Sequence, residues 1–187
     1  GKGPQPSIGS GGRRWYSLDQ INQIRAVLDE NSKSKNYIPR RRPGEHCQVM
    51  AVVNFKGGSG KTTTAAHLAQ YLALQGYRVL AVDLDPQASM TALHGYQPEY
   101  DVEANETMYA AIRYDEKRRP LAEIIKPTYF TGLDLIPGNL ELMEYEHDTP
   151  RALAERSTEP FFGRVASALG SVEDRYDVMV LDCPPQL

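Results

Sequence analysis

The sequence predicts an α/β fold with a mainly parallel, doubly wound sheet and helices on both of its faces. Strongly apolar segments alternate with helical ones, the first apolar segment runs into a glycine-rich turn, and two apolar segments end in aspartates. Strands that alternate with helices are typical of a parallel sheet buried on both faces. A chain of 187 residues is long enough for one such domain with a short extension.

The composition is that of an ordinary globular protein, since 41% of the residues are hydrophobic and 24% are charged. The two cysteines, Cys47 and Cys183, lack the spacing of a disulfide framework, which favours a reducing compartment. No apolar run approaches the roughly 20 residues that cross a bilayer, and the start of the chain has no signal-peptide core. We therefore expect a cytoplasmic protein without stable membrane association.

Charge divides the chain into two parts. Residues 1–48 contain nine Lys or Arg against four Asp or Glu, a local charge of +5, whereas the remainder contains twelve against twenty, a local charge of −8. A basic segment on an acidic body is typical of an arm that binds a polyanion, but flexible linkers are often basic too. Residues 1–12 are rich in Gly, Pro and Ser and are predicted to be disordered.

Residues 13–46 are predicted to form an N-terminal helical arm. Ser17 can cap a helix, and Gln20, three residues further on, completes a capping box. Apolar residues recur along this helix at helical spacing: Leu18, Ile21, Ile24, Val27 and Leu28. The helix could pack on the body or on a second chain. Alternatively, it is part of a DNA-binding region in which the three arginines at 40–42 contact phosphate, and the sequence leaves both interpretations open.

Residues 47–187 are predicted to form the α/β domain. Its expected strands span 49–55, 78–85, 133–138 and 176–185, and its expected helices span 62–75, 107–112, 121–125, 140–146 and 161–169. Gly76 is placed to end the first of these helices. A parallel strand needs a returning crossover, so we expect further strands and helices to follow the last strand in a longer protein.

The segment "KGGSGKTT", between the first strand and the first helix, has the chemistry of a phosphate-binding loop. Backbone N–H groups can converge on phosphate oxygens where a Cβ would collide, at Gly57, Gly58, Ser59 and Gly60. The following helix directs its positive end at the same anion. Lys61 can reach the terminal phosphates, and the Thr62 hydroxyl can bind Mg²⁺. A turn without a ligand would explain the glycines but not Lys61 and Thr62.

Three aspartates lie where buried strands end. Asp83 and Asp85 close the second strand, and Asp182 closes the last one. Because side chains two residues apart on a strand point the same way, Asp83 and Asp85 are expected to face one site. Carboxylates beside a triphosphate can hold a metal ion and orient the attacking water. One aspartate at a strand end is commonly a turn former, but three behind a phosphate loop favour nucleotide hydrolysis.

Three segments together resemble the ParA/MinD family of P-loop ATPases. "KGGSGKTT" resembles the deviant Walker A motif, in which a signature lysine precedes paired glycines, while "VDLDPQAS" resembles Walker A′ and "VLDCPP" resembles Walker B. The resemblance extends from about residue 49 to the end, with the motifs in family order. "DLDPQ" is more similar to the DNA-partitioning ParA branch than to the MinD branch. The arm with "YIPRRRPGEH" resembles the longer plasmid replication and partition ATPases, which carry an N-terminal DNA-binding region.

The resemblance implies a role for each residue of the site. Lys61 is the P-loop lysine, and Thr63 contacts the α-phosphate. Lys56 matches the signature lysine, which in this family reaches the nucleotide of the partner subunit, and Asp85 matches the carboxylate that positions the hydrolytic water. The metal site is implied at Thr62, Asp83 and Asp182. A lysine supplied in trans compensates charge only when two subunits meet, as an arginine finger does.

The resemblance implies a slow Mg-ATP-dependent ATPase for plasmid or chromosome partitioning, associated with the nucleoid. ATP would favour a homodimer that binds DNA, a centromere-binding ParB-type protein would stimulate hydrolysis, and the arm could add operator binding and autorepression. Alternatives are a repressor that uses ATP only as a ligand, a MinD-like membrane-cycling ATPase and a small-molecule kinase. Asp85 argues against the repressor, and Lys56 argues against the kinase.

Overall fold

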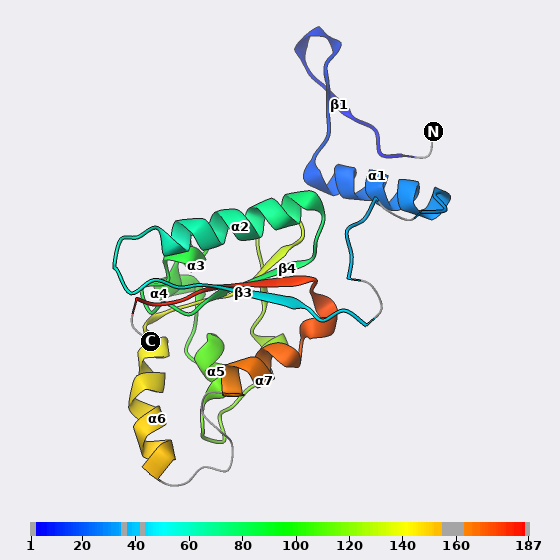
Figure 1. Ribbon diagram of the computed structural model, residues 1–187. Coiled ribbons are helices and arrows are strands. Elements are labelled where there is room, and N and C mark those ends of the chain that lie inside the picture. Colours follow the sequence, from blue (N-terminus) through cyan, green and yellow to red (C-terminus); the bar gives the residue numbers. More distant parts are fainter. Residues whose placement is uncertain (1–2, 35–36, 42–43, 155–162, 186–187) are drawn as a thin grey trace.

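The computed structural model describes residues 3–34, 37–41, 44–154 and 163–185 (Figure 1). Its body is built on a five-stranded sheet of order β3-β7-β4-β6-β5. The first four strands in this order run parallel, and β5 is antiparallel to β6. The strands are β3 (Gln48–Val52), β4 (Val79–Asp83), β5 (Lys126–Pro127), β6 (Leu133–Ile136) and β7 (Val178–Asp182). The predicted mainly parallel sheet is therefore confirmed.

Helices cover both faces of the sheet (Figure 1). Helix α2 (Lys61–Gln75) lies on one face, and α5 (Met108–Ile112) and α7 (Arg164–Gly170) lie on the other. Short elements connect the rest: α3 (Ser89–Leu93), α4 (Pro98–Asp101), η2 (Leu121–Glu123), η3 (Leu140–Met143), α6 (Glu144–Ala154) and η5 (Glu173–Arg175).

Two apolar cores result from the alternation of side chains along the strands. Val79 and Ala81 of β4 pack with alanines of α2, whereas Leu80 and Val82 belong to the opposite cluster, with α5 and α7. The α2 face offers small side chains to the sheet, namely Ala65, Ala69 and Ala73. Because these side chains are small, α2 approaches the sheet closely. The loop before α2 therefore lies near the ends of the strands.

Most predicted elements are present with shifted ends. The predicted helix over 62–75 begins one residue earlier, and Gly76 ends it in the left-handed conformation at φ +102°. The predicted helix over 140–146 is the one-turn η3, which continues into α6, and the weak helix over 121–125 is the short η2. The last predicted helix is α7, which begins at Arg164; residues 161–162 lie outside the described residues.

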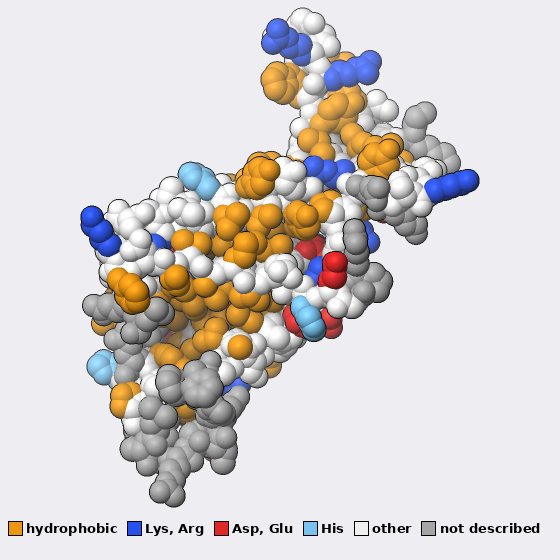
Figure 2. Space-filling view, in the orientation of Figure 1, with side chains coloured by type: hydrophobic (Ala, Val, Ile, Leu, Met, Phe, Trp, Pro, Cys, Tyr) orange, Lys and Arg blue, Asp and Glu red, His pale blue; other side chains and the backbone are white. Residues whose placement is uncertain are grey.

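The first strand is partly exposed in the described chain, although its apolar run is typical of a strand buried on both faces. Strand β3 lies at the edge of the sheet and pairs only with β7 among the strands described here. Val49 is 52% exposed and Val53 is 54% exposed. Hydrophobic side chains gather over this side of the molecule (Figure 2). An apolar, β-branched run shows that a strand is suited to burial, but the chain that would cover it decides whether it is buried.

The N-terminal arm projects away from the body (Figure 1). Its helix α1 (Leu18–Asn31) has the predicted capping box, since Gln20 N donates to Ser17 Oγ (3.2 Å) and Ser17 N donates to Gln20 Oε1 (2.9 Å). No described residue of α1 is buried, so its apolar stripe is not part of the core.

A small exposed hairpin precedes α1. It pairs β1 (Ser7–Ile8) with β2 (Arg14–Trp15) around the short helix η1 (Ser10–Gly12). This hairpin includes part of the segment predicted to be disordered, and all its strand residues are exposed. Of the three arginines proposed to contact phosphate, Arg42 lies outside the described residues. None of the helices in the described ranges is long and apolar enough to span a membrane.

Candidate nucleotide site

The glycine-rich loop joins the carboxyl end of β3 to the start of α2. Gly58 and Gly60 have positive φ values of +68° and +82°, a conformation that other residues adopt only at a cost. A Cβ at either glycine would meet no atom within 4 Å, so the backbone conformation, not crowding within the chain, requires glycine there. The open space beside these glycines is where a phosphate group would approach the backbone.

Helix α2 begins directly at this loop. Gly60 is its N-cap, and Thr64 N donates to Gly60 O (2.9 Å), so the first amides of the helix point toward the loop. Lys61, the first residue of α2, is buried, while Thr63 is exposed. A buried lysine ammonium at a helix N-terminus lies beside the positive end of the helix dipole, where an anion is needed to balance it.

Asp182 ends β7 next to this loop. In the sheet it is in register with Val52 of β3 on one side and with Asp83 of β4 on the other. Its side chain is fully buried, and neither carboxylate oxygen has a hydrogen-bond partner among the described residues. Burial raises the pKa of Asp182; the nearby Thr62 hydroxyl and Lys61 oppose this rise, and Asp85 adds to it. A buried carboxylate without partners is costly, which indicates a missing cation or donor.

Asp83 is also fully buried but has partners. One oxygen accepts hydrogen bonds from Thr91 N (2.8 Å) and Thr91 Oγ1 (2.7 Å), and the other accepts from Asp85 N (3.2 Å). The Thr91 hydroxyl in turn accepts from Gly138 N (2.8 Å), at the end of β6. Burial raises the pKa of Asp83 to about 6, although the bonds from Thr91 oppose this rise. These hydrogen bonds fix the turn after β4. Asp83 therefore contributes to the site indirectly, through the position of this turn.

Asp85 lies beyond the end of β4, not on the strand as predicted. Strand β4 ends at Asp83, and Asp85 Oδ1 accepts a hydrogen bond from Gln87 N (2.9 Å) in the following turn. The prediction that Asp83 and Asp85 point the same way, which assumed that both lie on one strand, therefore does not apply. Asp83 points toward α3, whereas Asp85 is half-exposed and close enough to Asp182 to raise the pKa of that residue.

Lys56 is exposed on the phosphate loop, unlike Lys61. Its backbone N–H donates to the side chain of Asn54 (2.9 Å), which shapes the loop before the paired glycines. Its neighbour Phe55 is 79% exposed. The two lysines of the motif thus occupy different environments, because one is enclosed by its own chain and the other is presented outward.

The residues present fit a magnesium ion held together with phosphate oxygens. The described part of the chain contains no group of three His, Cys, Asp or Glu side chains that could hold a metal ion alone. Mg²⁺ characteristically uses one or two protein oxygens, substrate phosphates and water. The unpartnered Asp182 carboxylate and the nearby Thr62 hydroxyl supply such a pair, so both would hold Mg²⁺ when a nucleotide brings its phosphates.

The structure brings the predicted site residues to the carboxyl edge of the sheet, where Lys56 differs from Lys61 in being exposed. Sequence reasoning missed two residues that organise the site, Thr91 and Asn54. Thr91 lies eight residues after Asp83, and no spacing rule connects them. Asn54 stands two residues before Lys56, and an Asx turn is a recognisable local signal for it.

A parallel sheet with a glycine-rich loop between a strand and a helix, and an aspartate at the end of the adjacent strand, defines a P-loop nucleoside-triphosphatase fold. Residues 47–187 match the family model AAA_31, described as an AAA domain. The chain belongs to this family, and the resemblance to the ParA/MinD group is confirmed.

Curated relatives agree with this family membership. The chain is 60% identical over its full length to "Putative replication protein A" of Sinorhizobium fredii, of which it covers 47%. It is 34% identical over 92% of its length to protein SopA of Escherichia coli, of which it covers 42%. The chain thus spans about half the length of the curated relatives it matches.

Solved structures of similar fold include a biosynthetic enzyme and a partition protein. Cobyrinic acid a,c-diamide synthase from Mycobacterium smegmatis, with a bound ATP analogue and magnesium, has a TM-score of 0.59 and 33% identity over 75% of this chain and 52% of that chain. A plasmid partition protein from Borrelia burgdorferi has a TM-score of 0.60 and 25% identity over 76% of this chain and 57% of that chain. The predicted P-loop fold is confirmed.

Proposed function

We propose that this chain is the nucleotide-binding part of a ParA-type ATPase that acts in plasmid or chromosome partitioning. The observation that carries the proposal is the buried, unpartnered carboxylate of Asp182 beside the phosphate loop, because it requires a cation that a Mg-nucleotide supplies. The similarity to a plasmid partition protein supports the partitioning role. The similarity to an enzyme solved with an ATP analogue and magnesium supports both ligands, ATP and Mg²⁺.

ATP would bind with its phosphates on the loop from Gly57 to Gly60 and at the start of α2. Backbone amides of the loop and the Lys61 ammonium bind the β- and γ-phosphate oxygens, and Thr63 contacts the α-phosphate. Thr62 and Asp182 would hold Mg²⁺, which would neutralise charge on the triphosphate when bound. Asp83 supports this metal site by fixing the turn after β4, next to Asp182 in the sheet.

Asp85 is proposed to position the hydrolytic water. Its carboxylate is half-exposed and is oriented by the backbone N–H of Gln87. Such a group is suited to accept a hydrogen bond from water. Asp83 is not suited to this role, since both of its oxygens already accept hydrogen bonds from protein groups.

Lys56 is proposed to act on the nucleotide of a second subunit. Its exposure on the loop, next to the exposed Phe55, fits a group that completes a site across a dimer. A positive charge added in trans stabilises the transferring phosphoryl group only in the dimer, so hydrolysis depends on dimerisation. Slow hydrolysis would then set the lifetime of a DNA-bound dimer on the nucleoid. A ParB-type protein would be the partner that stimulates hydrolysis.

The test measures phosphate release by the full-length protein with Mg-ATP, with and without DNA. Asp85→Ala is expected to reduce turnover by at least 100-fold while ATP binding is retained, because general-base positioning contributes about 10²–10⁴-fold. Lys56→Ala is expected to abolish the part of turnover that rises with protein concentration. Wild-type turnover no higher than that of Asp85→Ala would refute the enzyme assignment.

A second candidate is a DNA-binding repressor for which ATP is only a conformational ligand. The observation that favours it is the exposed helix α1 on a basic arm, which has the form of an interaction element. The two candidates differ in one measurement, since the repressor requires ATP binding without Asp85-dependent turnover. Operator binding and autorepression by the arm are compatible with either candidate.

A further inference from the structure

The hydroxyl of Thr91 lies at the centre of a buried hydrogen-bond network beside the nucleotide site. Thr91 is the third residue of α3 and is fully buried. Its Oγ1 donates to Asp83 Oδ2 (2.7 Å) and accepts from Gly138 N (2.8 Å). This one side chain therefore connects the end of β4 with the loop after β6, and the two strands are neighbours in the sheet.

Both residues that bond the Thr91 hydroxyl are in contact with Asp85. Asp83 accepts a hydrogen bond from Asp85 N through its other oxygen, Oδ1 (3.2 Å). The backbone of Gly138 lies so close that a Cβ there would stand 3.1 Å from Asp85 O and 3.0 Å from Asp83 Cγ. The N–H group and the carbonyl group of Asp85 are thus each next to a residue that Thr91 holds.

The turn that carries Asp85 leads directly into α3. Asp85 O accepts from Ala88 N (2.8 Å), and Asp85 Oδ1 accepts from Gln87 N (2.9 Å). Ala88, the N-cap of α3, has a φ of +53°, a left-handed conformation that is unfavourable for a residue with a Cβ. Such a conformation persists only where surrounding contacts impose it. Thr91 supplies such a contact, because its N–H also donates to Asp83 Oδ2 (2.8 Å) and anchors α3.

Thr128 provides a comparison within the same chain. Its Oγ1 also holds a turn, since it donates to Leu133 O (2.7 Å) and accepts from Phe130 N (3.0 Å). This turn joins β5 to β6 and lies at the amino end of β6, whereas Gly138 follows the carboxyl end. The two hydroxyl groups thus make equivalent bonds, but the partners of Thr91 are the ones that contact Asp85.

We propose that Thr91 is a positioning residue for hydrolysis, which sets the place of Asp85 through Asp83 and Gly138. The inference rests on the proposed role of Asp85 in orienting the hydrolytic water. A hydroxyl is suited to this task, because one oxygen can both donate to a carboxylate and accept from an amide. A displacement of about 1 Å near a reacting group can cost on the order of 100-fold in rate. Nucleotide binding depends less on Thr91, since the phosphate loop joins β3 and α2.

The test compares Thr91→Val, which keeps the shape of the side chain and removes the hydroxyl, with Thr91→Ser, which keeps the hydroxyl. The matched control is Thr128→Val, which removes equivalent bonds from the turn between β5 and β6. Phosphate release by the full-length protein at saturating Mg-ATP gives the turnover, and titration of a fluorescent ATP analogue gives the nucleotide affinity. Each variant is assayed below its melting temperature.

Thr91→Val is expected to lower turnover by about 10- to 100-fold and to leave nucleotide affinity unchanged. Thr91→Ser should retain most of the turnover. Thr128→Val should lower the melting temperature about as much as Thr91→Val does, because it removes equivalent bonds, but it should not lower turnover comparably. Equal effects of Thr91→Val and Thr128→Val on turnover, or equal losses for Thr91→Val and Thr91→Ser, would overturn the proposal.

The same substitution in the Asp85→Ala background shows whether Thr91 acts through Asp85. Thr91→Val is expected to lower the residual turnover of Asp85→Ala no further, since residues that act as a unit are not additive. An equal fold-loss in both backgrounds would contradict the proposal. If Thr91→Val does not fold, Thr91→Cys replaces it with the same expected results, because a thiol is a weak donor and a weak acceptor.

The inference and the proposed function can fail separately. If Asp85→Ala lowers turnover and Thr91→Val does not, only the positioning role of Thr91 fails. If Asp85→Ala retains wild-type turnover, the proposed role of Asp85 fails, and the positioning role fails with it. The Lys56 experiments do not depend on either result.

Discussion

Two buried aspartates occupy opposite ends of β7 and have opposite environments. Asp177 lies just before the strand; burial raises its pKa, but hydrogen bonds from Arg78 outweigh this effect and leave the pKa below its usual value. Asp182 ends the strand, and burial raises its pKa although the nearby Thr62 hydroxyl opposes this rise. The first carboxylate stabilises the fold, and the second is expected to destabilise the protein when no cation is bound.

The environments of these aspartates predict opposite effects of the same substitution. Without nucleotide, Asp182→Asn is expected to raise the melting temperature by about 2–4 °C, the shift that 1 kcal/mol produces in a protein of this size. Asp177→Asn is expected to destabilise the protein by roughly 3 kcal/mol, because it leaves Arg78 without its buried partner. Thermal unfolding of both variants checks this, and shifts of the same sign would contradict it.

Asp182→Asn is also expected to remove the rise in melting temperature that Mg-ATP gives to the wild type, because a carboxamide is a poorer magnesium ligand. The comparison is made at several Mg-ATP concentrations on the same preparations. A nucleotide-dependent rise equal to that of the wild type would show that Asp182 does not hold the metal.

The raised pKa of Asp83 predicts how the free energy of unfolding depends on pH. Its folded pKa of about 6 lies above the unfolded value of 3.8. The folded state therefore binds more protons between these values, and the free energy of unfolding falls as pH rises from about 4 to about 6. The contribution is about 3 kcal/mol, since one pKa unit corresponds to about 1.4 kcal/mol. Asp182 acts in the same direction.

Urea unfolding of the nucleotide-free protein across this pH range measures the effect, with Asp83→Asn as the comparison. The variant should show a flatter pH dependence than the wild type. An equally steep dependence in both would assign the effect to other groups.

Among the elements, α1 is stabilised by its caps and not by the core. Ser17 and Gln20 satisfy each other's backbone amides, and no described residue of the helix is buried. Ser17→Ala is expected to weaken α1 by about 1 kcal/mol, so that its amides exchange hydrogen about fivefold faster. The melting temperature of the body should stay unchanged. Hydrogen exchange by mass spectrometry reports both regions, and protection lost in α2 would contradict the separation.

The sequence was sufficient to predict those elements whose determinants are local. The capping box of α1, the glycine that ends α2 and the phosphate loop are each specified within a few residues. The exposure of β3 was not predictable, because it depends on which chain covers that edge. The separation of Asp83 from Asp85 was missed because β4 ends two residues earlier than its apolar pattern suggested. The role of the Thr91 hydroxyl was missed because Thr91 is distant in sequence.

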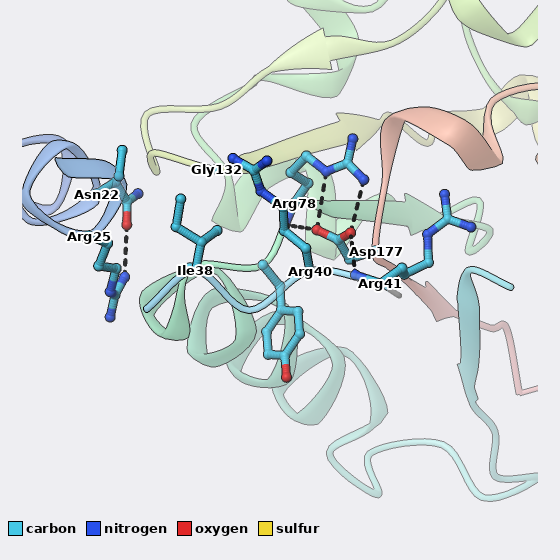
Figure 3. A pocket seen from close by; sticks show the side chains of 11 residues that line it. Asn22, Arg25, Ile38, Arg40, Arg41, Arg78, Gly132 and Asp177 are labelled. Carbon is cyan, nitrogen blue, oxygen red and sulfur yellow. Dashed lines mark hydrogen bonds and ion pairs between the residues drawn. The ribbon is translucent and has the colours of Figure 1, made fainter. Parts of the chain in front are cut away.

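For the whole molecule, the two ends of the sheet have different chemistry. The nucleotide site lies at the carboxyl ends of β3, β4 and β7. A pocket lined by Arg25, Arg40, Arg41 and Arg78 lies at the amino ends of β4 and β7 (Figure 3). Ligands at the two places do not compete for space. The nucleotide site and this pocket can therefore be occupied at the same time.

A dimer with Lys56 acting in trans predicts complementation between inactive variants. In a mixed dimer of Lys56→Ala and Asp85→Ala subunits, the Lys56→Ala subunit keeps its own Asp85 and receives Lys56 from its partner. An equal mixture is expected to recover about a quarter of wild-type turnover, since half of the dimers are mixed and each has one intact site. Phosphate release by the mixture of full-length variants measures this. Turnover equal to the mean of the separate variants would place Lys56 in its own site.

Strand β7 also offers a practical reporter. Met179, fully buried near the middle of the strand, lies between the aspartate held by Arg78 and the aspartate of the nucleotide site. Isotope labelling of the methionine methyl groups would give one resonance for Met179 among those of the five methionines of this chain, and a Met179→Leu variant would identify it. Titrating nucleotide and duplex DNA separately would then reveal, from one peak, whether the two ends communicate.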